Sequence, residues 1–583
     1  MGRHNDRPTV QGTAYRLSRR AALRLLGGAG AAAFLAACGN TASPTTGAAT
    51  TASSGGAAPT TGAATKAAGG AGLTGTAATS PLAPTATTAP VAAGTPTGSP
   101  AAAASPGTVS MEIQIANSGA KLPTDKVNFR WVDSGDQKAV FFKQYFELYQ
   151  QAHPNITVGY DALPWNEIAK VVPLGVQSGN AHDVFQVPLN VPGPQAVTEG
   201  WVAPLDDLIP NFQEWKKAFP KGAFASGITD FNGKTYTIPL TSNQRYSTLI
   251  LYNTAIMQQA GYDPGAKPLT WDEFRAAAKK VTQQGAGKYY GLIIGGNQTN
   301  QWSDFVGSLG RMAGAPGSGG DNVTNNIDYR TGEYTFTTAA YLGALDLLLA
   351  LKGDGSIFPG SNALTAPQAR SQMPQGAAGM ILQGPWNVPQ WKREAPDFKF
   401  GVGSQPVPNS GTPLPLSYGP GGSNLLWVYA KSPNKAIAAD IFSYLGSEQG
   451  QTAWGTISDG ADAPIFPSAS QNAKLDPEAQ QAQQLFIQQM RLRPDPAVRN
   501  PDVSKVDLEL KTLTPNFGQV IQGLYTGQLK DAKAALKDLQ DRSEAELQRA
   551  IKAAQAKGAK VSRDDWKFAN WDPTKDFTEA DYK

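Results

Sequence analysis

The sequence predicts an α/β fold that begins near residue 125. Residues 127–131 alternate between apolar and polar side chains as a strand does, and a turn at 133–136 leads into a helix. A second strand (156–160), a second helix (165–178) and a third strand (183–185) follow. Strand, helix, strand, helix, strand at this spacing is typical of a parallel sheet covered by helices. All twelve tryptophans lie after residue 130, so the hydrophobic core is expected in this part of the chain.

Later segments carry the local signals of further turns and helices. A tight Asn-Gly hairpin turn is predicted at 231–234. Residues 270–273 have the spacing of a capping box, in which a hydroxyl and a carboxylate each bond a free amide at a helix start. Helices are predicted at 432–446 and 529–557, each ended by glycine. The chain from residue 125 onward is therefore predicted to be α/β throughout.

The first 38 residues predict export. Arg19 and Arg20 form a twin-arginine signature, and a thirteen-residue apolar run follows at 25–37. That run is too short for a bilayer span, which needs about twenty residues. It ends in Leu-Ala-Ala-Cys38, which resembles the lipobox of bacterial lipoproteins and implies a lipid on Cys38; the alternative is a signal cleaved elsewhere, with an incidental cysteine. We expect residues 1–38 to be an export signal. The protein would then lie on the outer face of the cytoplasmic membrane, in the periplasm or at the cell surface, anchored by lipid.

Composition sets two further limits. Residues 39–110 are built mainly from Ala, Thr, Gly, Pro and Ser, with Lys66 as the one charge and no aromatic side chain. Such a stretch cannot bury enough apolar surface to order itself, so we predict a disordered linker. The chain has 50 basic and 46 acidic residues, of which residues 1–37 hold six and one, leaving 44 and 45. This near-neutral balance argues against nucleic acid as a partner.

Four sequence blocks follow one another in the predicted α/β part. They are EGWVAPLD at 199–206, FNGK at 231–234, PLTWDEF at 268–274 and, after GAAGM, GPW at 384–386. With these blocks the chain resembles, from about residue 126 to 556, the extracellular solute-binding proteins of ABC importers. The resemblance is to their sugar-binding class, bacterial family 1, which includes the maltose-binding proteins.

The resemblance implies a two-lobed periplasmic-binding-protein fold, type II-like, within residues 111–583. Passages between the lobes are implied near 240, 370 and 430. The expected first lobe is about 125–240 plus 371–430, and the expected second lobe is about 241–370 plus 431–583. The resemblance further implies a monomer that closes on a carbohydrate and delivers it to the permease subunits of an ABC importer. An aromatic tail at 561–583 departs from the family pattern; we expect it to pack onto a lobe, with a docking role as the alternative.

A sugar presents faces of C–H bonds and a rim of hydroxyls, so flat aromatic surfaces and planar amides or carboxylates suit it. By resemblance, the Gly-Pro-Trp block brings its indole to the cleft, and one or two of residues 243–246 point inward. The predicted ligand-binding residues are Trp386, Trp302, Asp133, Ser134, Asn243, Tyr246, Gly422 and Ser423. Core packing is the alternative for both Trp386 and Trp302, and a structural turn is the alternative for Gly422 and Ser423. Val187 stands where the maltose binder has a stacking tryptophan, which argues against maltodextrin.

No catalytic residue, metal ligand or cofactor is predicted, and we expect no enzyme activity. The three histidines are isolated in the sequence, and no Gly-x-Ser-x-Gly motif occurs. Two alternatives to a sugar receptor stay open. One is a receptor for a polyamine, phosphodiester or peptide, although a cationic solute needs several acids and the candidate loops supply Asp133, Asp136 and Asp304. The other is an anchored glycoside hydrolase or lyase, because a pair of catalytic carboxylates needs no local motif.

Overall fold

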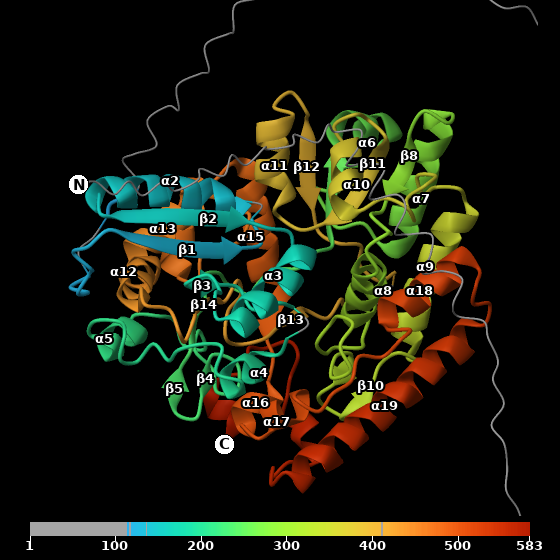
Figure 1. Cartoon of the computed structure of the whole chain (residues 1–583). Helices are drawn as coiled ribbons and strands as arrows, with labels where there is room; N and C mark the ends of the chain where they lie inside the picture. Colours follow the sequence, from blue (N-terminus) through green and yellow to red (C-terminus); the bar gives the residue numbers. More distant parts are fainter. Residues whose placement is uncertain (1–112, 116–117, 136, 190, 410–411) are drawn as a thin grey trace, which may run out of the picture. The chain divides into compact units, whose positions relative to one another are not determined.

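The computed structural model describes residues 113–583 except 116–117, 136, 190 and 410–411. Two β-sheets, each with its own helices, organise this part of the chain into two lobes (Figure 1). The predictions for the signal at 1–38 and the linker at 39–110 lie outside the described residues.

The first sheet has the strand order β2-β1-β3-β14-β6. Its strands are β1 (Val127–Asp133), β2 (Ile156–Ala162), β3 (Val184–Phe185), β6 (Thr237–Ile238) and β14 (Leu426–Val428). β1 runs parallel to both β2 and β3, with Val127 opposite Ile156 and Trp131 opposite Val184. The predicted parallel sheet is therefore confirmed, while β14 is antiparallel to β3 and β6.

Helices cover both faces of the first sheet. Trp131 packs on one face, where its ring centroid lies 4.8 Å from that of Phe142 and 6.1 Å from that of Phe442. Val132 points to the opposite face and shares a core cluster with Ile168 of α3 and Ala196 of α4. The helices of this lobe are α2 (Gln137–Ala152), α3 (Trp165–Ser178), α4 (Gly193–Thr198), α5 (Phe212–Lys217), α12 (Lys435–Leu445), α13 (Glu448–Ile457) and α14 (Pro467–Asn472).

The second sheet has the strand order β12-β7-β11-β8. Its strands are β7 (Leu249–Asn253), β8 (Tyr290–Ile293), β11 (Ala378–Gln383) and β12 (Phe400–Gly403). β11 is parallel to β8, whereas β7 runs against both β11 and β12. The helices of this lobe up to the last long one are α6 (Thr254–Ala260), α7 (Trp271–Gly285), α8 (Asn300–Met312), α9 (Ala339–Gly353), α10 (Ala366–Gln372), α11 (Asn387–Glu394), α15 (Pro477–Gln489), α16 (Pro496–Arg499), α17 (Val503–Asp507), α18 (Phe517–Thr526) and α19 (Ala532–Ala556).

Three short ribbons lie outside the two sheets. Their strands are β4 (Asp230–Phe231) with β5 (Lys234–Thr235), β9 (Ile327–Asp328) with β10 (Glu333–Tyr334), and β13 (Leu416–Tyr418) with β15 (Met490–Leu492). The first ribbon is the predicted hairpin, with Asn232 (φ 52°) and Gly233 (φ 77°) in the left-handed conformation that its turn requires. The third joins segments more than seventy residues apart, and β13 and β15 run parallel.

The expected division into lobes is wrong in its second half. Strands β11 and β12, within 371–430, pair with β7 and so belong to the second sheet. Helices α12 to α14, within 431–583, pack in the hydrophobic core of the first sheet. The chain therefore passes between the sheets near 240 as expected, then between β12 and β14 and between α14 and α15. Which sheet a strand joins is decided by hydrogen bonds to strands that are distant in the sequence. The local pattern of apolar residues does not indicate that choice.

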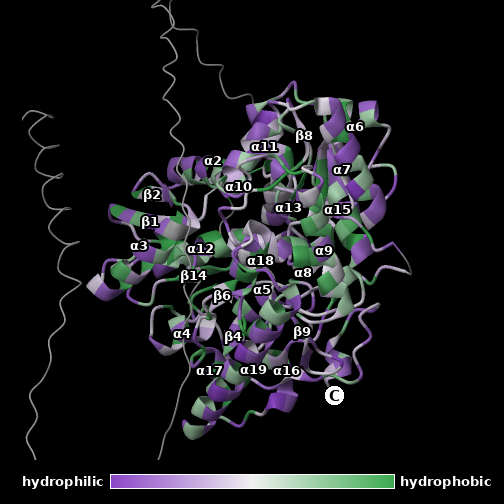
Figure 2. Cartoon of the chain, turned by 90° about the vertical axis from the view of Figure 1, so that its right-hand side faces the viewer, coloured by the Kyte–Doolittle hydropathy of each residue, from purple (hydrophilic) through white to green (hydrophobic). Residues whose placement is uncertain are grey.

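Local helix signals are better predictors. Thr270 and Glu273 form the complete capping box of α7. The helix expected from 432 is found as α12, although it begins at Lys435 after Asn434. The long helix is α19, and Figure 2 shows hydrophilic and hydrophobic residues mixed along it, as in a helix with one buried face.

The aromatic tail packs onto the second lobe as expected. Trp566, Phe568, Trp571 and Phe577 are all buried in the core cluster of that lobe. Two 3-10 turns, η1 (Arg563–Trp566) and η2 (Glu579–Tyr582), shape the tail. Within the part of the chain that the structure describes, no helix combines the length and apolar character of a bilayer span.

Candidate functional site

Both sheets place polar side chains at one edge, where most of their strands end. In the first sheet, Ser134 follows β1 and Gln186 follows β3. In the second sheet, Gln383 is the last residue of β11, and Ser404 follows β12. Ligands of open α/β sheets bind outside the carboxyl ends of the strands, so these two edges are where a site is expected.

A chain of hydrogen bonds runs along the edge of the first sheet. The Ser134 backbone N–H donates to Oε1 of Gln186 (2.8 Å), and Nε2 of Gln186 donates to Oδ1 of Asn424 (3.5 Å). Nδ2 of Asn424 then donates to Oγ1 of Thr241 (3.0 Å) and to Oδ2 of Asp462 (2.9 Å). The network links the ends of β1 and β3 to two passages between the lobes and ends at the Asp462 carboxylate.

Arg245 connects this network to the second lobe. Its guanidinium forms an ion pair with Asp462 and donates to Oγ of Ser423 (3.3 Å). Its Cζ lies 5.8 Å from the ring centroid of Trp386, over the indole face. Burial lowers the pKa of Arg245 to about 10, which still leaves the group charged at neutral pH. One cation therefore joins a first-lobe carboxylate to a second-lobe aromatic ring.

A cavity of about 280 Å³ opens beside Arg245 and Trp386. The residues that line it are Arg245, Tyr246, Ser247, Asp304, Ser308, Arg311, Gly319, Gly320, Trp386, Leu416, Ser417 and Met490. They come from the first passage, from α8, from the loop after α8, from the start of α11 and from the β13–β15 ribbon. The wall thus combines one indole, an aliphatic patch and several polar groups, the mixture expected of a small-molecule site.

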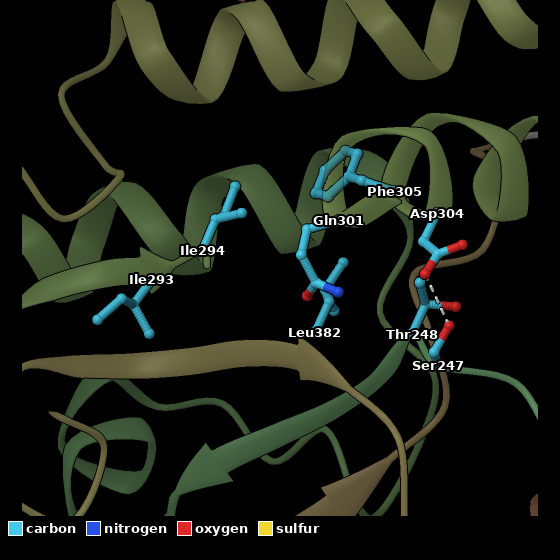
Figure 3. Close-up of a pocket in the computed structure, with 8 residues that line it drawn as sticks. All are labelled: Ser247, Thr248, Ile293, Ile294, Gln301, Asp304, Phe305 and Leu382. Carbon is cyan, nitrogen blue, oxygen red and sulfur yellow. Dashed lines mark hydrogen bonds between the residues drawn. The ribbon is translucent and has the colours of Figure 1, made fainter. Parts of the chain in front are cut away.

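Asp304 on α8 forms the acidic part of the wall. The Ser247 hydroxyl donates to its Oδ2 (3.0 Å), and Figure 3 shows the two side chains facing each other. Burial raises the pKa of Asp304 to about 6, although the Ser247 bond and the nearby charge of Arg311 oppose the rise. A smaller void of about 10 Å³ adjoins this pair, close to the room that one water needs.

Arg311, at the end of α8, is the second cation of the wall. Its Nη2 donates to Oγ of Ser308 (3.0 Å), while its buried Nε has no hydrogen-bond partner. The ion pairs found in the described residues do not include Arg311. A Cβ on Gly319 would collide with the guanidinium, so the glycine makes room for it. The cavity therefore offers a cation that Ser308 alone does not saturate.

Two of the predicted binding residues line the cavity, Trp386 and Tyr246. Trp386 is half-buried, and its Nε1 donates to Oε1 of Gln383 (3.3 Å). A Cβ on Gly384 would lie 2.3 Å from the indole, so the Gly-Pro-Trp block lets the ring fold back over the backbone. The Tyr246 hydroxyl donates to Oε1 of Gln489 (2.7 Å), and burial raises the pKa of this tyrosine.

The prediction for Trp302 is wrong. Its side chain is 0% exposed, and its Nε1 donates to the Gly296 carbonyl (2.7 Å). Its ring packs 4.4 Å from that of Tyr525 in the core of the second lobe. Asp304, two residues further along α8, lines the cavity in place of Trp302, because successive residues of a helix point in different directions.

Asp133 and Ser134 stand at the expected strand end but do not line the cavity. The Asp133 carboxylate is fully buried and accepts bonds from Nε1 of Trp131, the N–H of Gly135 and the hydroxyl of Tyr160. Burial raises the pKa of Asp133, and those donors together with Lys138 counteract the rise. In this structure Asp133 holds the turn after β1, and Ser134 anchors the polar network through its backbone.

Asn243, Gly422 and Ser423 do not line the cavity either and stand in the passages between the lobes. Nδ2 of Asn243 donates to the Gly419 carbonyl (3.3 Å), and the Ser423 N–H donates to the Thr241 carbonyl (2.7 Å). A Cβ on Gly422 would approach that of Pro239 to 2.4 Å. These residues connect two passages to each other. Ser423 is linked to the cavity by the hydrogen bond that its hydroxyl accepts from Arg245, which lines the cavity.

Sequence reasoning missed most of the polar wall. Ser247, Ser308, Arg311 and Ser417 were not singled out, and Asp304 was noted only as one of the acids available to a cationic solute. The polar face of α8, with Asp304, Ser308 and Arg311 three or four residues apart, is the one signal that points to them.

We predict that stability depends on pH through Asp304. A folded-state pKa of about 6, above the value near 4 of an unfolded aspartate, means that the folded chain binds this proton more tightly. The contribution is complete below about pH 4 and is lost as pH rises through 6. Between pH 4 and pH 8, Asp304→Asn should therefore gain about 2–3 kcal/mol of unfolding free energy relative to the parent, because a shift of about two pKa units corresponds to roughly 2.7 kcal/mol. Urea unfolding at the two pH values measures it. Ser247→Ala removes a hydrogen bond that favours the ionised form of Asp304, so the parent carrying this change should lose more stability between pH 4 and pH 8. An equal pH response in Asp304→Asn and the parent would contradict the prediction.

Two α/β lobes are thus joined by three passages, and a mixed aromatic and polar cavity lies beside the second sheet. Among solved structures, the fold resembles a solute-binding protein of an ABC transporter from Thermotoga lettingae, solved with α-D-tagatose bound. The two share 19% identity and a TM-score of 0.53, over 73% of this chain and 100% of the other. A maltotriose-binding protein of Thermus thermophilus, solved with maltotriose, gives 21% identity and a TM-score of 0.52, over 73% and 100%.

The sequence identifies the family. A binding protein of Brucella abortus is 24% identical over 340 residues, which are 58% of this chain and 74% of that protein. The family model described as bacterial extracellular solute-binding protein matches residues 134–452. The chain therefore belongs to the bacterial extracellular solute-binding proteins, as its resemblance to them predicts.

Proposed function

We propose that this protein binds a carbohydrate in the cavity beside Arg245 and Trp386 and delivers it, unchanged, to the permease of an ABC importer. The observation that carries the proposal is the pairing of the Trp386 indole with Asp304, Arg311 and Ser417 around one cavity. The indole offers a flat surface to the C–H face of a sugar. A hydroxyl both donates and accepts, so it suits a wall with a carboxylate and a guanidinium side by side.

The charges of the cavity favour a sugar over a polyamine. Arg245 and Arg311 stand against Asp304 alone among the described residues that line it. A polycation would meet two guanidinium groups and one carboxylate whose proton is held unusually tightly. A phosphodiester or peptide stays as the second candidate, because Arg311 would accept an anion, yet the indole surface finds a better partner in a sugar ring.

The same lining supports a receptor without catalytic activity. Glycoside hydrolysis needs two carboxyl groups about 5–9.5 Å apart across the scissile bond. In the described part of the chain, Asp304 is the one carboxylate on the cavity wall. The two neighbours solved with tagatose and maltotriose are binding proteins, which agrees with this reading.

The N-terminal segments supply the proposed location. The twin-arginine signature at 19–20 and the lipobox ending at Cys38 would export the chain and leave it lipid-anchored outside the cytoplasmic membrane. Residues 39–110 would then form the linker between the lipid and the binding lobes, with a reach of roughly 45–50 Å for a flexible chain of that length.

Cys38→Ser is expected to abolish lipid attachment, because the thiol is the group that would carry the lipid. Metabolic labelling with a radioactive fatty acid measures the attachment. Arg19→Lys combined with Arg20→Lys should block export without removing the lipid acceptor, which separates the two signals. Undiminished label in Cys38→Ser would contradict the anchor while leaving the binding function open.

A thermal-shift screen of the exported protein against mono- and oligosaccharides tests the binding function. A sugar present at one hundred times its Kd should add about 2.7 kcal/mol to the free energy of unfolding. Spermidine, a phosphodiester and a tripeptide are the controls for the other solute classes. Stabilisation by one of these, with no response to any sugar, would overturn the proposal, as would release of sugar fragments during the titration.

A further inference from the structure

The cavity wall contributed by the β13–β15 ribbon is held in place from behind. Leu416 and Ser417 of β13 and Met490 of β15 line the cavity. The two strands pair in parallel, with Leu416 opposite Met490 and Tyr418 opposite Leu492. The Ser417 hydroxyl donates to the Gly317 carbonyl (2.7 Å), so β13 also holds the loop that brings Gly319 and Gly320 to the cavity.

The C-terminal tail occupies the other side of β15. The Leu492 N–H donates to Oδ1 of Asp576 (2.6 Å), and the Phe577 N–H donates to the Leu492 carbonyl (2.8 Å). Both backbone groups of Leu492 are thereby used by the tail. Burial raises the pKa of Tyr418 in β13 to about 12, and the charge of Asp576 adds to the rise.

Further contacts fix the tail along the segment that follows β15. The Asp495 N–H donates to the Tyr582 hydroxyl (2.8 Å), and Nη1 of Arg499 donates to the Lys567 carbonyl (2.9 Å). The Arg499 guanidinium lies 3.8 Å from the ring centroid of Phe568. Phe568 in turn packs on Phe577, with centroids 5.6 Å apart. The tail therefore contacts β15 and residues 493–499 through both backbone hydrogen bonds and aromatic rings.

We propose that residues 561–583 act as a brace that sets the position of the β13–β15 wall and so tunes solute affinity without touching the solute. The proposal rests on the proposed function, since the wall matters for binding only if the solute occupies this cavity. Asp576 and Phe577 are the positioning residues: Asp576 fixes the register of β15, and Phe577 locks the tail into the core. A tail that merely filled the core would contribute to stability and leave affinity unchanged.

Asp576→Ala in the full chain is the first test. It removes the acceptor for the Leu492 N–H from an exposed side chain, so the core is left intact. We expect about a fivefold weaker Kd for the sugar found in the thermal-shift screen, the effect of losing one positioning hydrogen bond. Asp576→Asn keeps a carbonyl oxygen that can accept the bond, so it should bind nearly as the parent does. Glu579→Ala, an exposed carboxylate of the same tail with no bond to β15, is the matched control.

Amide hydrogen exchange supplies a readout that needs no ligand. In Asp576→Ala, a peptide covering β13 (416–418) should exchange faster, together with the peptide covering β15, and the Glu579→Ala control should show neither change. Unchanged exchange in β13, or a lowered melting temperature with an unchanged Kd, would overturn the brace. If the parent binds no sugar while β13 still exchanges faster in Asp576→Ala, the proposed function fails. The coupling between the tail and β13 would then stand on its own.

Discussion

Trp386→Ala is expected to weaken solute binding by about 2 kcal/mol or more, which is roughly a thirtyfold increase in Kd. Arg245 lies over the indole of Trp386, and this half-buried tryptophan lines the cavity. Aromatic side chains that anchor a ligand usually contribute more than their share of the binding energy. Isothermal calorimetry with the sugar identified by thermal shift measures the change directly.

The position of the ring offers two controls. Trp386→Phe keeps a flat aromatic surface and should retain part of the affinity. Trp165→Ala removes a half-buried tryptophan of α3 that does not line the cavity, so its Kd should match that of the parent. Gly384→Ala should weaken binding as well, because the new Cβ would displace the indole. If Trp386→Ala binds as tightly as the parent, the solute does not occupy this cavity.

The local elements of the fold follow from short-range physics that a sequence displays. The Asn232-Gly233 turn and the capping box of α7 depend on residues within four positions of one another. The membership of β11 and β12 depends on hydrogen bonds to β7, more than one hundred residues away. Both sheets contain short apolar strands, so the pattern of one strand does not say which sheet it joins. The expected lobes therefore differ from the structure at β11 and β12, which pair in the second sheet, and at α12 to α14, which pack on the first. β14 and helices α17 to α19 lie in the lobes where they are expected.

The candidate site shows the same limit at the level of side chains. Trp302 and Trp386 look alike in the sequence, since each stands near the start of a helix beside polar residues. A glycine two positions before Trp386 leaves room for an indole that lines the cavity, whereas Trp302 is buried in the core. Arg311 and Met490 reach the same cavity from segments about 180 residues apart, a convergence that follows from tertiary pairing alone.

Asp462→Ala is expected to lower the free energy of unfolding by about 3 kcal/mol, because it leaves the Arg245 guanidinium in a buried position without its counter-ion. The side chains of the pair are only 23% and 14% exposed, so water cannot replace the lost carboxylate fully. Asn424 loses an acceptor at the same time, and with it the polar network between the first sheet and the passages. Urea unfolding at neutral pH, with the midpoint and slope fitted together, measures the loss.

A double variant separates the cost of an unpaired charge from the value of the pair. Arg245→Met with Asp462→Ala removes both charges, and it should recover most of the stability that Asp462→Ala loses, because a buried pair contributes little beyond an apolar replacement. Asp207→Ala breaks the ion pair between Asp207 (82% exposed) and Lys234 (48% exposed). Its free energy of unfolding should stay within about 0.5 kcal/mol of that of the parent. The double variant should nevertheless bind sugar more weakly than the parent, because it lacks the Arg245 guanidinium that lies over the indole of Trp386. A loss in Asp462→Ala no larger than that in Asp207→Ala would show that the pair does not hold the passages together, and that the polar network ends at Asn424.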